Sequence, residues 1–265
     1  MEFAYNSKFW SCLAAYFPIR LRYSRNFRLD PEENYILNYH PHGIAAFGVV
    51  TAFATNGLGF RNLFPNIRAR FMVHETSFMI PILREVFSLR GDCSVNSKSF
   101  DHLLTASTGN LLTLICGGLA EADLSKPDEL KVVVKTRKGF VKKAIVHGAN
   151  IIPCIGFGEN SAFKKIDFAP SSFMHRLEDR WYRLFKFKHP IYYGQSLFFR
   201  KRKGFMPYKR PITVVMGDPI IIEKNENPTQ MQIEQTHAIY IKTLQELYDS
   251  NRDLCTEYDK TLVLL

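Results

Sequence analysis

The sequence predicts a single α/β domain. Short apolar segments typical of buried strands alternate with helical segments along the chain. Its 265 residues are 46% hydrophobic and 23% charged, fractions typical of a folded protein with a sizeable core. No internal repeat and no linker divides the sequence. Wholesale disorder and a collagen-like chain are therefore excluded.

The predicted strands are short apolar runs that end at glycine, proline or polar residues. The first of them leads directly into the turn His40-Pro41-His42-Gly43, which precedes an apolar helical segment. The predicted strands are residues 35–39, 68–73, 110–116, 150–157, 212–216 and 220–222.

The predicted helices show helical spacing of apolar residues or residues typical of helix ends. Gly148 is a C-cap candidate, and Asn227-Pro228 begins a final long helix. The other predicted helices are residues 44–55, 78–87, 97–105, 139–147 and 171–187.

We divide the chain into an N-terminal segment, residues 1–29, and a main domain, residues 30–265. The N-terminal segment is aromatic at first and basic later, a pattern that suits the interface of a membrane. A helix docked on the core, followed by a solvated basic loop, explains the pattern equally well. The residues concerned are Phe3, Tyr5, Phe9, Trp10, Tyr16 and Phe17, followed by Arg20, Arg22, Arg25 and Arg28.

Composition narrows the choice of partners and compartments. The formal net charge of +10 favours an anionic partner, such as a membrane surface, nucleic acid or a phosphate-rich ligand. The five cysteines are scattered and form no CxxC pair, which favours reduced thiols. No stretch is apolar enough for a transmembrane helix, and the apolar run at residues 9–19 lacks the cleavage site of a signal peptide.

The strongest candidate for chemistry is the turn His40-Pro41-His42-Gly43. It lies at the carboxyl end of a predicted strand, where α/β folds bind their ligands. A neutral imidazole there can take a proton from a hydroxyl, and the N-terminus of the following helix would favour developing negative charge. A metal-dependent site is the alternative, but Ile44-Ala45-Ala46 follow directly and offer no acidic ligand.

Two further clusters are candidates for supporting roles. Glu121 follows a predicted strand and Gly117-Gly118, and either orients a histidine, holds a substrate hydroxyl or lies exposed in a turn. Four cations begin the predicted helix 139–147, where they oppose the helix dipole. Such a cluster favours an anionic ligand such as a phosphate, or is a solvated basic face. The cations are Arg137, Lys138, Lys142 and Lys143.

In their order and spacing these segments resemble the diacylglycerol/monoacylglycerol acyltransferase family, the PlsC-related type that includes wax-alcohol acyltransferases. The resemblance runs from about Phe9 into the last helix. Its motifs are Tyr16-Phe17-Pro18, Asn34-Tyr35-Ile36, Tyr39-His40-Pro41-His42-Gly43-Ile44, Pro81-Ile82-Leu83-Arg84-Glu85, Gly117-Gly118-Leu119-Ala120-Glu121-Ala122, Arg137-Lys138-Gly139-Phe140-Val141, His147-Gly148-Ala149, Phe157-Gly158-Glu159-Asn160, His189-Pro190-Ile191-Tyr192-Tyr193-Gly194 and Arg210-Pro211-Ile212-Thr213-Val214-Val215-Met216-Gly217.

The resemblance implies a mixed sheet flanked by helices, and transfer of a fatty acyl group from acyl-CoA to the hydroxyl of diacylglycerol or monoacylglycerol. It implies His42 as the general base, His40 as its support and Glu121 as the next candidate. The four cations then have the CoA phosphates to bind. No metal and no cofactor beyond the co-substrate acyl-CoA is expected.

The resemblance also implies the cytosolic face of the endoplasmic reticulum membrane and lipid droplets. We expect lipid and a membrane surface as partners and no nucleic acid, and leave a homo-oligomer open. Three alternatives stay open: a wax-alcohol acyltransferase, a metal-dependent hydrolase, and a shortened family member that binds lipid without turnover. The last is kept because the hydrophobic hairpin usual upstream of Tyr16-Phe17-Pro18 is missing from this sequence.

Overall fold

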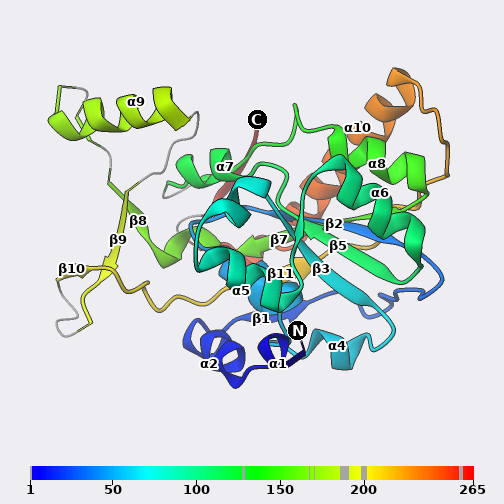
Figure 1. Ribbon diagram of the computed structural model, residues 1–265, viewed down its shortest axis with the longest axis horizontal. Coiled ribbons are helices and arrows are strands. Elements are labelled where there is room, and N and C mark those ends of the chain that lie inside the picture. The colour runs from blue at the N-terminus through cyan, green and yellow to red at the C-terminus, as the bar shows by residue number, and fades with distance from the viewer. Residues whose placement is uncertain are drawn as a thin grey trace.

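The structure, a computed structural model, describes residues 2–126, 129–166, 168–169, 171–185, 191–197, 202–256 and 259–265. Within these residues, seven strands form the central sheet, in the order β1-β11-β7-β2-β5-β3-β4 (Figure 1). They are β1 (Arg20–Arg22), β2 (Tyr35–His40), β3 (Arg68–Val73), β4 (Cys93–Ser94), β5 (Asn110–Leu114), β7 (Asn150–Phe157) and β11 (Thr213–Met216).

The central sheet is mixed. Strands β7, β2, β5, β3 and β4 run parallel, whereas β11 runs antiparallel to β7 and β1 pairs parallel with β11. Because β2 lies between β7 and β5, the carboxyl ends of these three strands meet at one edge of the sheet. The predicted α/β domain with a mixed sheet is confirmed.

Helices cover both faces of the sheet (Figure 1). The helices α2 (Lys8–Tyr16) and α4 (Phe60–Leu63) pack on one face with Tyr35, Leu37 and Tyr39. The other face carries Ile36 and its neighbours, and is covered by the helices α6 (Ser97–Ala106), α8 (Gly139–His147) and α10 (Gln230–Asp249). Since both faces are covered, β2 is buried along its whole length.

The remaining elements are short or lie at the margin of the domain. Helix α9 lies away from the central sheet, next to a small antiparallel sheet (Figure 1). These elements are α1 (Glu2–Tyr5), α3 (Phe47–Val49), the π-helix η1 (Val50–Ala54), η2 (Glu75–Met79), α5 (Leu83–Arg90), α7 (Leu119–Asp123), β6 (Glu129–Val132), η3 (Glu159–Ala162), β8 (Lys164–Lys165), α9 (Phe173–Phe185), β9 (Tyr192–Gln195), β10 (Lys203–Gly204), η4 (Arg252–Leu254) and β12 (Thr261–Leu264).

Several predicted helix boundaries are wrong. The segment predicted as a helix from Ile44 begins only at Phe47 and becomes a π-helix. The segment 78–87 is a 3-10 turn followed by α5, which begins after Pro81. Helix α10 is capped by the Thr229 hydroxyl and not by Asn227. Residues 186–187 and His189-Pro190 lie outside the described residues.

The N-terminal segment is part of the folded domain. Strand β1 joins the central sheet, and Phe17 and Phe27 are buried in the core. Phe9 is exposed on α2. Contact of this segment with a membrane stays a prediction. Among the described residues, no helix combines the length and the hydropathy needed to cross a bilayer.

Candidate active site

The turn His40-Pro41-His42-Gly43 ends the central strand β2. Successive side chains of a strand point to opposite faces of the sheet, so Tyr39 and His40 face different layers of the core. Each of them meets a buried glutamate there. Glu121 comes from the segment after β5, and Glu159 from the segment after β7. The two strands that flank β2 therefore supply one carboxylate each.

His40 is fully buried, and both of its ring nitrogens have partners. Nδ1 lies 2.8 Å from Oε1 of Glu121, and Nε2 lies 3.1 Å from the hydroxyl of Tyr240 on α10. Burial lowers the pKa of His40, but the adjacent Glu121 carboxylate and the Cys116 thiol outweigh burial and raise it to about 10. His40 is therefore an imidazolium at neutral pH. It has no ring nitrogen left for a substrate.

Glu121 is 1% exposed, so the exposed position considered from the sequence is wrong. Its Oε1 accepts hydrogen bonds from Nδ1 of His40 and from the backbone N–H of Val133, at 2.8 and 3.1 Å. Its Oε2 accepts from the backbone N–H of His42 at 2.9 Å. Of the two histidines, Glu121 thus orients the ring of His40, and it holds His42 by the backbone. Both of its oxygens are occupied.

His42 differs from His40 in its surroundings. Its side chain is half-buried, and Nδ1 lies 2.9 Å from the carbonyl oxygen of Gly43. A carbonyl accepts and cannot donate, so the proton of the neutral ring is on Nδ1 and the lone pair is on Nε2. Nε2 has no hydrogen-bond partner within the described part of the chain. His42 therefore presents the basic nitrogen at this edge of the sheet.

Glu159 is the buried group that the sequence did not single out. Its Oε1 accepts from the backbone N–H of Phe47 at 2.7 Å. Its Oε2 accepts from the hydroxyl of Tyr39 and the backbone N–H of Gly48, at 2.7 and 2.9 Å. The first N–H groups of α3 are thus occupied by a side chain. They are therefore not available to a substrate oxygen, although the sequence predicted that the N-terminus of this helix would favour developing negative charge.

The four cations divide into two pairs. Lys138 and Lys143 form ion pairs with Glu234 and Asp101, at 3.2 and 2.5 Å. Arg137 and Lys142 are exposed at the beginning of α8 and have no ion-pair partner within the described residues. Val133, four residues before Arg137, donates to Glu121. The N-terminus of α8 therefore follows, by a few residues, a segment that is hydrogen-bonded to the same carboxylate as the histidine turn.

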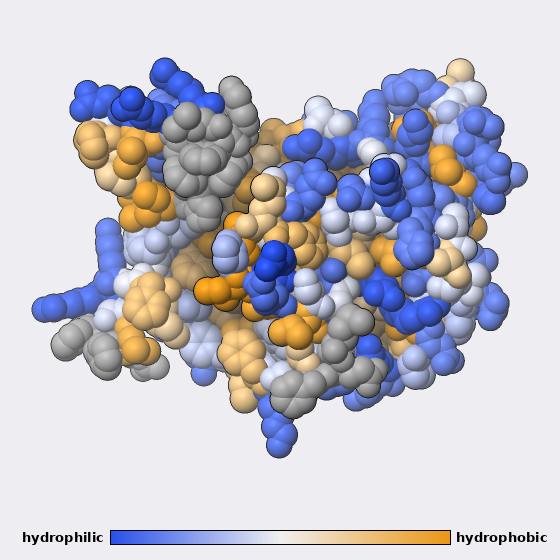
Figure 2. Space-filling view, in the orientation of Figure 1, coloured by the Kyte–Doolittle hydropathy of each residue, from blue (hydrophilic) through white to orange (hydrophobic). Residues whose placement is uncertain are grey.

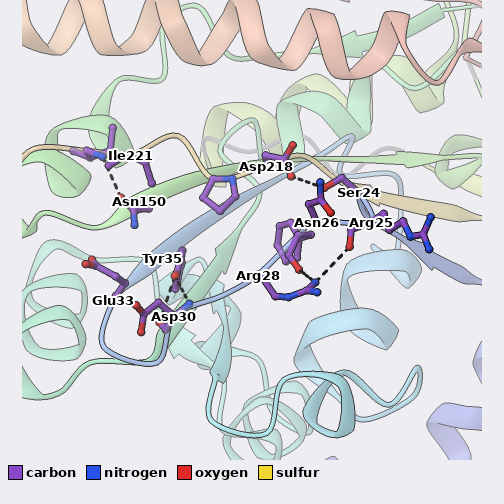
Figure 3. Close-up of a pocket in the computed structure, with 13 residues that line it drawn as sticks. Ser24, Arg25, Asn26, Arg28, Asp30, Glu33, Tyr35, Asn150, Asp218 and Ile221 are labelled. Atoms are coloured by element: carbon purple, nitrogen blue, oxygen red, sulfur yellow. Dashed lines mark hydrogen bonds between the residues drawn. The ribbon is translucent and has the colours of Figure 1, made fainter.

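A separate hollow lies at the opposite edge of the sheet, beside the first residues of β2 and β7. It has a volume of about 700 Å³. Among its polar side chains, Ser24 donates to Asp218, and Asn150 accepts from the backbone N–H of Ile222 (Figure 3). It is lined by Ser24, Arg25, Asn26, Phe27, Arg28, Asp30, Glu33, Tyr35, Asn150, Asp218, Pro219, Ile221 and Ile222. Neither His40 nor His42 lines this hollow.

The described part of the chain brings no set of metal ligands together. No group of three or more His, Cys, Asp or Glu residues converges among these residues. The two histidines of the turn also point to different partners, Glu121 and Gly43. Nothing in this geometry resembles the ligand set of a zinc site.

Comparison with known proteins identifies the family. The profile described as "Diacylglycerol acyltransferase" matches residues 1–265. "Diacylglycerol O-acyltransferase 2" of Danio rerio is 39% identical over 242 residues, which cover 91% of this chain and 66% of the relative. "Acyl-CoA wax alcohol acyltransferase 1" of Homo sapiens is 35% identical over 257 residues, 96% of this chain and 77% of the relative. The chain thus spans about two thirds to three quarters of the length of these two relatives.

A solved structure also aligns with the chain. It is the 1-acyl-sn-glycerophosphate (LPA) acyltransferase PlsC from Thermotoga maritima, with a TM-score of 0.47 and 9% sequence identity over 92% of this chain and 79% of that one. The sequence matches carry the assignment, and they confirm the resemblance drawn from the motifs. This chain belongs to the diacylglycerol acyltransferase family.

Proposed function

We propose that this chain is an acyl-CoA-dependent O-acyltransferase that acylates the hydroxyl of diacylglycerol or monoacylglycerol, with His42 as the general base. The observation that carries the proposal is the state of the His42 ring. Its Nδ1–H is bonded to the carbonyl of Gly43, and its Nε2 lies at the carboxyl edge of the sheet without a protein partner among the described residues. Family membership supplies the reaction class.

The proposed reaction is a direct transfer. Nε2 of His42 takes the proton of the acceptor hydroxyl as that oxygen attacks the thioester carbonyl of acyl-CoA. The tetrahedral intermediate collapses, the C–S bond breaks, and the CoA thiolate leaves. The thiolate takes the proton from His42, so that an ester and free CoA are formed and the neutral imidazole is restored.

His40 and Glu121 support the base without touching the substrate in this proposal. The imidazolium and the carboxylate form a buried pair of zero net charge. The second carboxylate oxygen accepts from the backbone N–H of His42 and so fixes the start of the turn. Glu121 is thus a positioning residue for both histidines. It does not bind the acceptor hydroxyl, because its oxygens already have donors.

Acyl-CoA is the anion that the cations of α8 would bind. Arg137 and Lys142 are exposed and offer their charge to the phosphates of CoA, together with the N-terminus of the helix. Lys138 and Lys143 are held by acidic partners, so we assign them a smaller share of the binding. The CoA part of the substrate then lies a few residues along the chain from Val133, whose backbone N–H donates to Glu121.

Lipid substrates and an apolar surface support contact with a membrane. Exposed apolar side chains gather at the centre of one face (Figure 2). Met79, the last residue of η2, and Ile82, which directly precedes α5, are 79% and 77% exposed. Phe173 on α9 is 69% exposed. We propose the cytosolic face of the endoplasmic reticulum, and lipid droplets, as the location.

The acceptor has a second candidate. A wax-alcohol acyltransferase is also a close relative, and this chain covers more of its length than of the Danio rerio diacylglycerol enzyme. Both reactions need the same base and the same thioester, since only the carbon skeleton behind the attacking hydroxyl differs. A long-chain alcohol is therefore the alternative acceptor.

The test is acyl transfer from labelled oleoyl-CoA in membranes of cells that lack their own triacylglycerol synthesis. Diacylglycerol, monoacylglycerol and a long-chain alcohol are offered together and singly. We expect a labelled glyceride from the unaltered 265-residue chain, and a loss of about 100-fold or more in His42→Ala. His102→Ala is the matched control, because His102 is an exposed histidine on α6.

Three results would contradict parts of this proposal. Transfer to the alcohol alone would establish the wax-ester alternative. Full activity of His42→Ala would remove His42 from the reaction. No product from a folded, membrane-bound chain, with both His42 and His102 intact, would favour a lipid-binding protein without turnover.

A further inference from the structure

Glu159 is a buried carboxylate that the proposed reaction does not use. It lies at the beginning of η3, directly after β7, and is 2% exposed. Three donors surround it: the backbone N–H groups of Phe47 and Gly48 and the hydroxyl of Tyr39. An apolar side chain in its place would leave the N–H groups of Phe47 and Gly48 without this acceptor, so the carboxylate holds the segment that supplies them.

The side chain of Glu159 packs directly on the histidine turn. A Cβ added to Gly43 would lie 2.6 Å from Cγ of Glu159, a distance that real contacts do not reach. Gly43 also has φ +57°, which glycine adopts readily and other residues do not. A side chain at position 43 is thus excluded on both counts. The Glu159 side chain occupies the space behind Gly43.

The carbonyl of Gly43 is the link to the base. It accepts the Nδ1–H of His42 at 2.9 Å, and this bond leaves the lone pair on Nε2. Glu159 fixes the turn on both sides of that carbonyl. It packs against Gly43 itself, and it holds Phe47 and Gly48 four and five residues further along.

We infer that Glu159 is a positioning residue that holds the Gly43 carbonyl in place and thereby fixes the reactive tautomer of His42. The inference rests on the proposed role of His42. The turn is then held by two carboxylates. Glu121 bonds the backbone N–H of His42 from the β5 side, and Glu159 holds the residues after His42 from the β7 side.

The charge of Glu159 matters to its role. Burial raises the pKa of Glu159 to about 7, although its three donors work against this rise. The titratable groups that face it are Tyr39 from β2 and Asp259 from the segment before β12. Glu121 is the titratable group bonded to His42 itself. Near neutral pH, part of the population therefore has the carboxylate charged.

The first variant is Glu159→Gln, which keeps the shape of the side chain. Its amide N–H₂ faces the backbone N–H of either Phe47 or Gly48, so one hydrogen bond becomes a donor–donor contact. We expect kcat to fall about 10- to 100-fold at an unchanged KM for oleoyl-CoA, as a small misplacement of a catalytic group does.

The split between kcat and KM separates positioning from mere stability. A misplaced His42 slows the transfer step and leaves the binding of acyl-CoA unchanged, so kcat falls and KM does not. Both constants are measured at a temperature at which thermal unfolding shows the variant to be folded. A destabilised protein with an intact turn unfolds at a lower temperature and keeps the wild-type kcat wherever it is folded.

Tyr39→Phe keeps the test decisive if Glu159→Gln does not fold. It removes one donor of Glu159 and leaves the ring in the core. We expect a smaller fall in kcat, again at an unchanged KM for oleoyl-CoA. Tyr35→Phe is the matched control, because Tyr35 is a buried residue of the same strand and its hydroxyl bonds the backbone of Asp30, at the other end of β2.

The outcomes distinguish this inference from the proposed function. Loss of activity in His42→Ala, with a wild-type kcat in both Glu159→Gln and Tyr39→Phe, overturns the positioning role and leaves the proposed reaction intact. An active His42→Ala overturns the reaction itself. In the His42→Ala background, we expect Glu159→Gln to change the residual rate less than about twofold, because residues that act as one unit are not additive.

Discussion

Glu121 contacts His42 through the backbone and not through the ring: its Oε2 accepts the N–H of His42 at 2.9 Å, while Nδ1 of that histidine bonds Gly43. The carboxylate–histidine pair of this site is instead Glu121 with His40. In a triad the buried carboxylate holds the ring of the base. Here it holds the ring of a second histidine, and the base obtains its tautomer from a backbone carbonyl. The buried ion pair and the basic nitrogen are thus on different residues.

Glu121→Gln tests the buried pair. The change leaves a buried imidazolium without its counter-charge, and breaking such a pair by removing one partner costs about 3–5 kcal/mol of folding free energy. We expect a fall of the unfolding midpoint by several degrees and a loss of activity. Circular dichroism with thermal unfolding, on the same preparation used for the assay, measures both. Wild-type stability in this variant would contradict the assigned pair.

The pair also predicts how stability depends on pH. The pKa of His40 is raised in the folded chain to about 10, above its ordinary value of 6.5. The folded state therefore binds one more proton than the unfolded state between these values, so this contribution is complete below pH 6.5 and is lost as pH rises through 10. We expect the unfolding midpoint to decline over this window, and to decline less in Glu121→Gln. An unfolding midpoint that declines equally with pH in the wild-type protein and in Glu121→Gln would refute the assigned pair.

Arg137 and Lys142, which form no ion pair with any described residue, predict the binding of acyl-CoA. Arg137→Gln combined with Lys142→Gln is expected to raise the KM for oleoyl-CoA about tenfold with little change in kcat, because only binding is lost. The effect should shrink at high ionic strength. Lys224→Gln with Lys242→Gln removes the same charge from exposed positions elsewhere, 58% and 78% exposed, and should leave KM unchanged. Equal effects of the two double variants would make the charge effect non-specific.

The packing around Tyr39 predicts a difference between two glycines. A Cβ on Gly156 would overlap with the Tyr39 hydroxyl, so Gly156→Ala is expected to destabilise the protein by about 1–3 kcal/mol and to lower activity through Glu159. Gly139 has nothing within 4 Å of an added Cβ. Gly139→Ala at the start of α8 should leave stability unchanged or raise it by about 0.5–1 kcal/mol. Chemical denaturation of both variants measures the change in the free energy of unfolding, and equal changes would contradict this prediction.

The sequence was sufficient for the strands of the core and insufficient for the strands at its margin. Residues 35–39 and 150–157 are mostly apolar, and both form buried strands. Strand β1, by contrast, has the sequence Arg20-Leu21-Arg22, which reads as a basic loop. It is a strand because its backbone pairs with β11, far away in the sequence. Local pattern contains no information on such a pairing.

The same limit applies to the site. His40, His42 and Glu121 were found because each follows a predicted strand and stands in a pattern that chemistry can use. Glu159 was passed over, since Gly158-Glu159-Asn160 has the composition of a surface loop. The available signal is that Glu159 directly follows a predicted strand, residues 150–157. The structure adds that this strand lies parallel to 35–39, which brings the carboxyl ends of both strands to one edge of the sheet.

His42→Asn tests the central claim most directly. The amide of asparagine can donate to the Gly43 carbonyl as Nδ1–H does, so the turn keeps its bond, while the basic nitrogen is removed. We predict wild-type thermal stability and a rate of acyl transfer from oleoyl-CoA lowered about 100-fold or more, independent of the acceptor. A folded His42→Asn that transfers acyl groups at the wild-type rate would contradict the assignment of His42 as the general base.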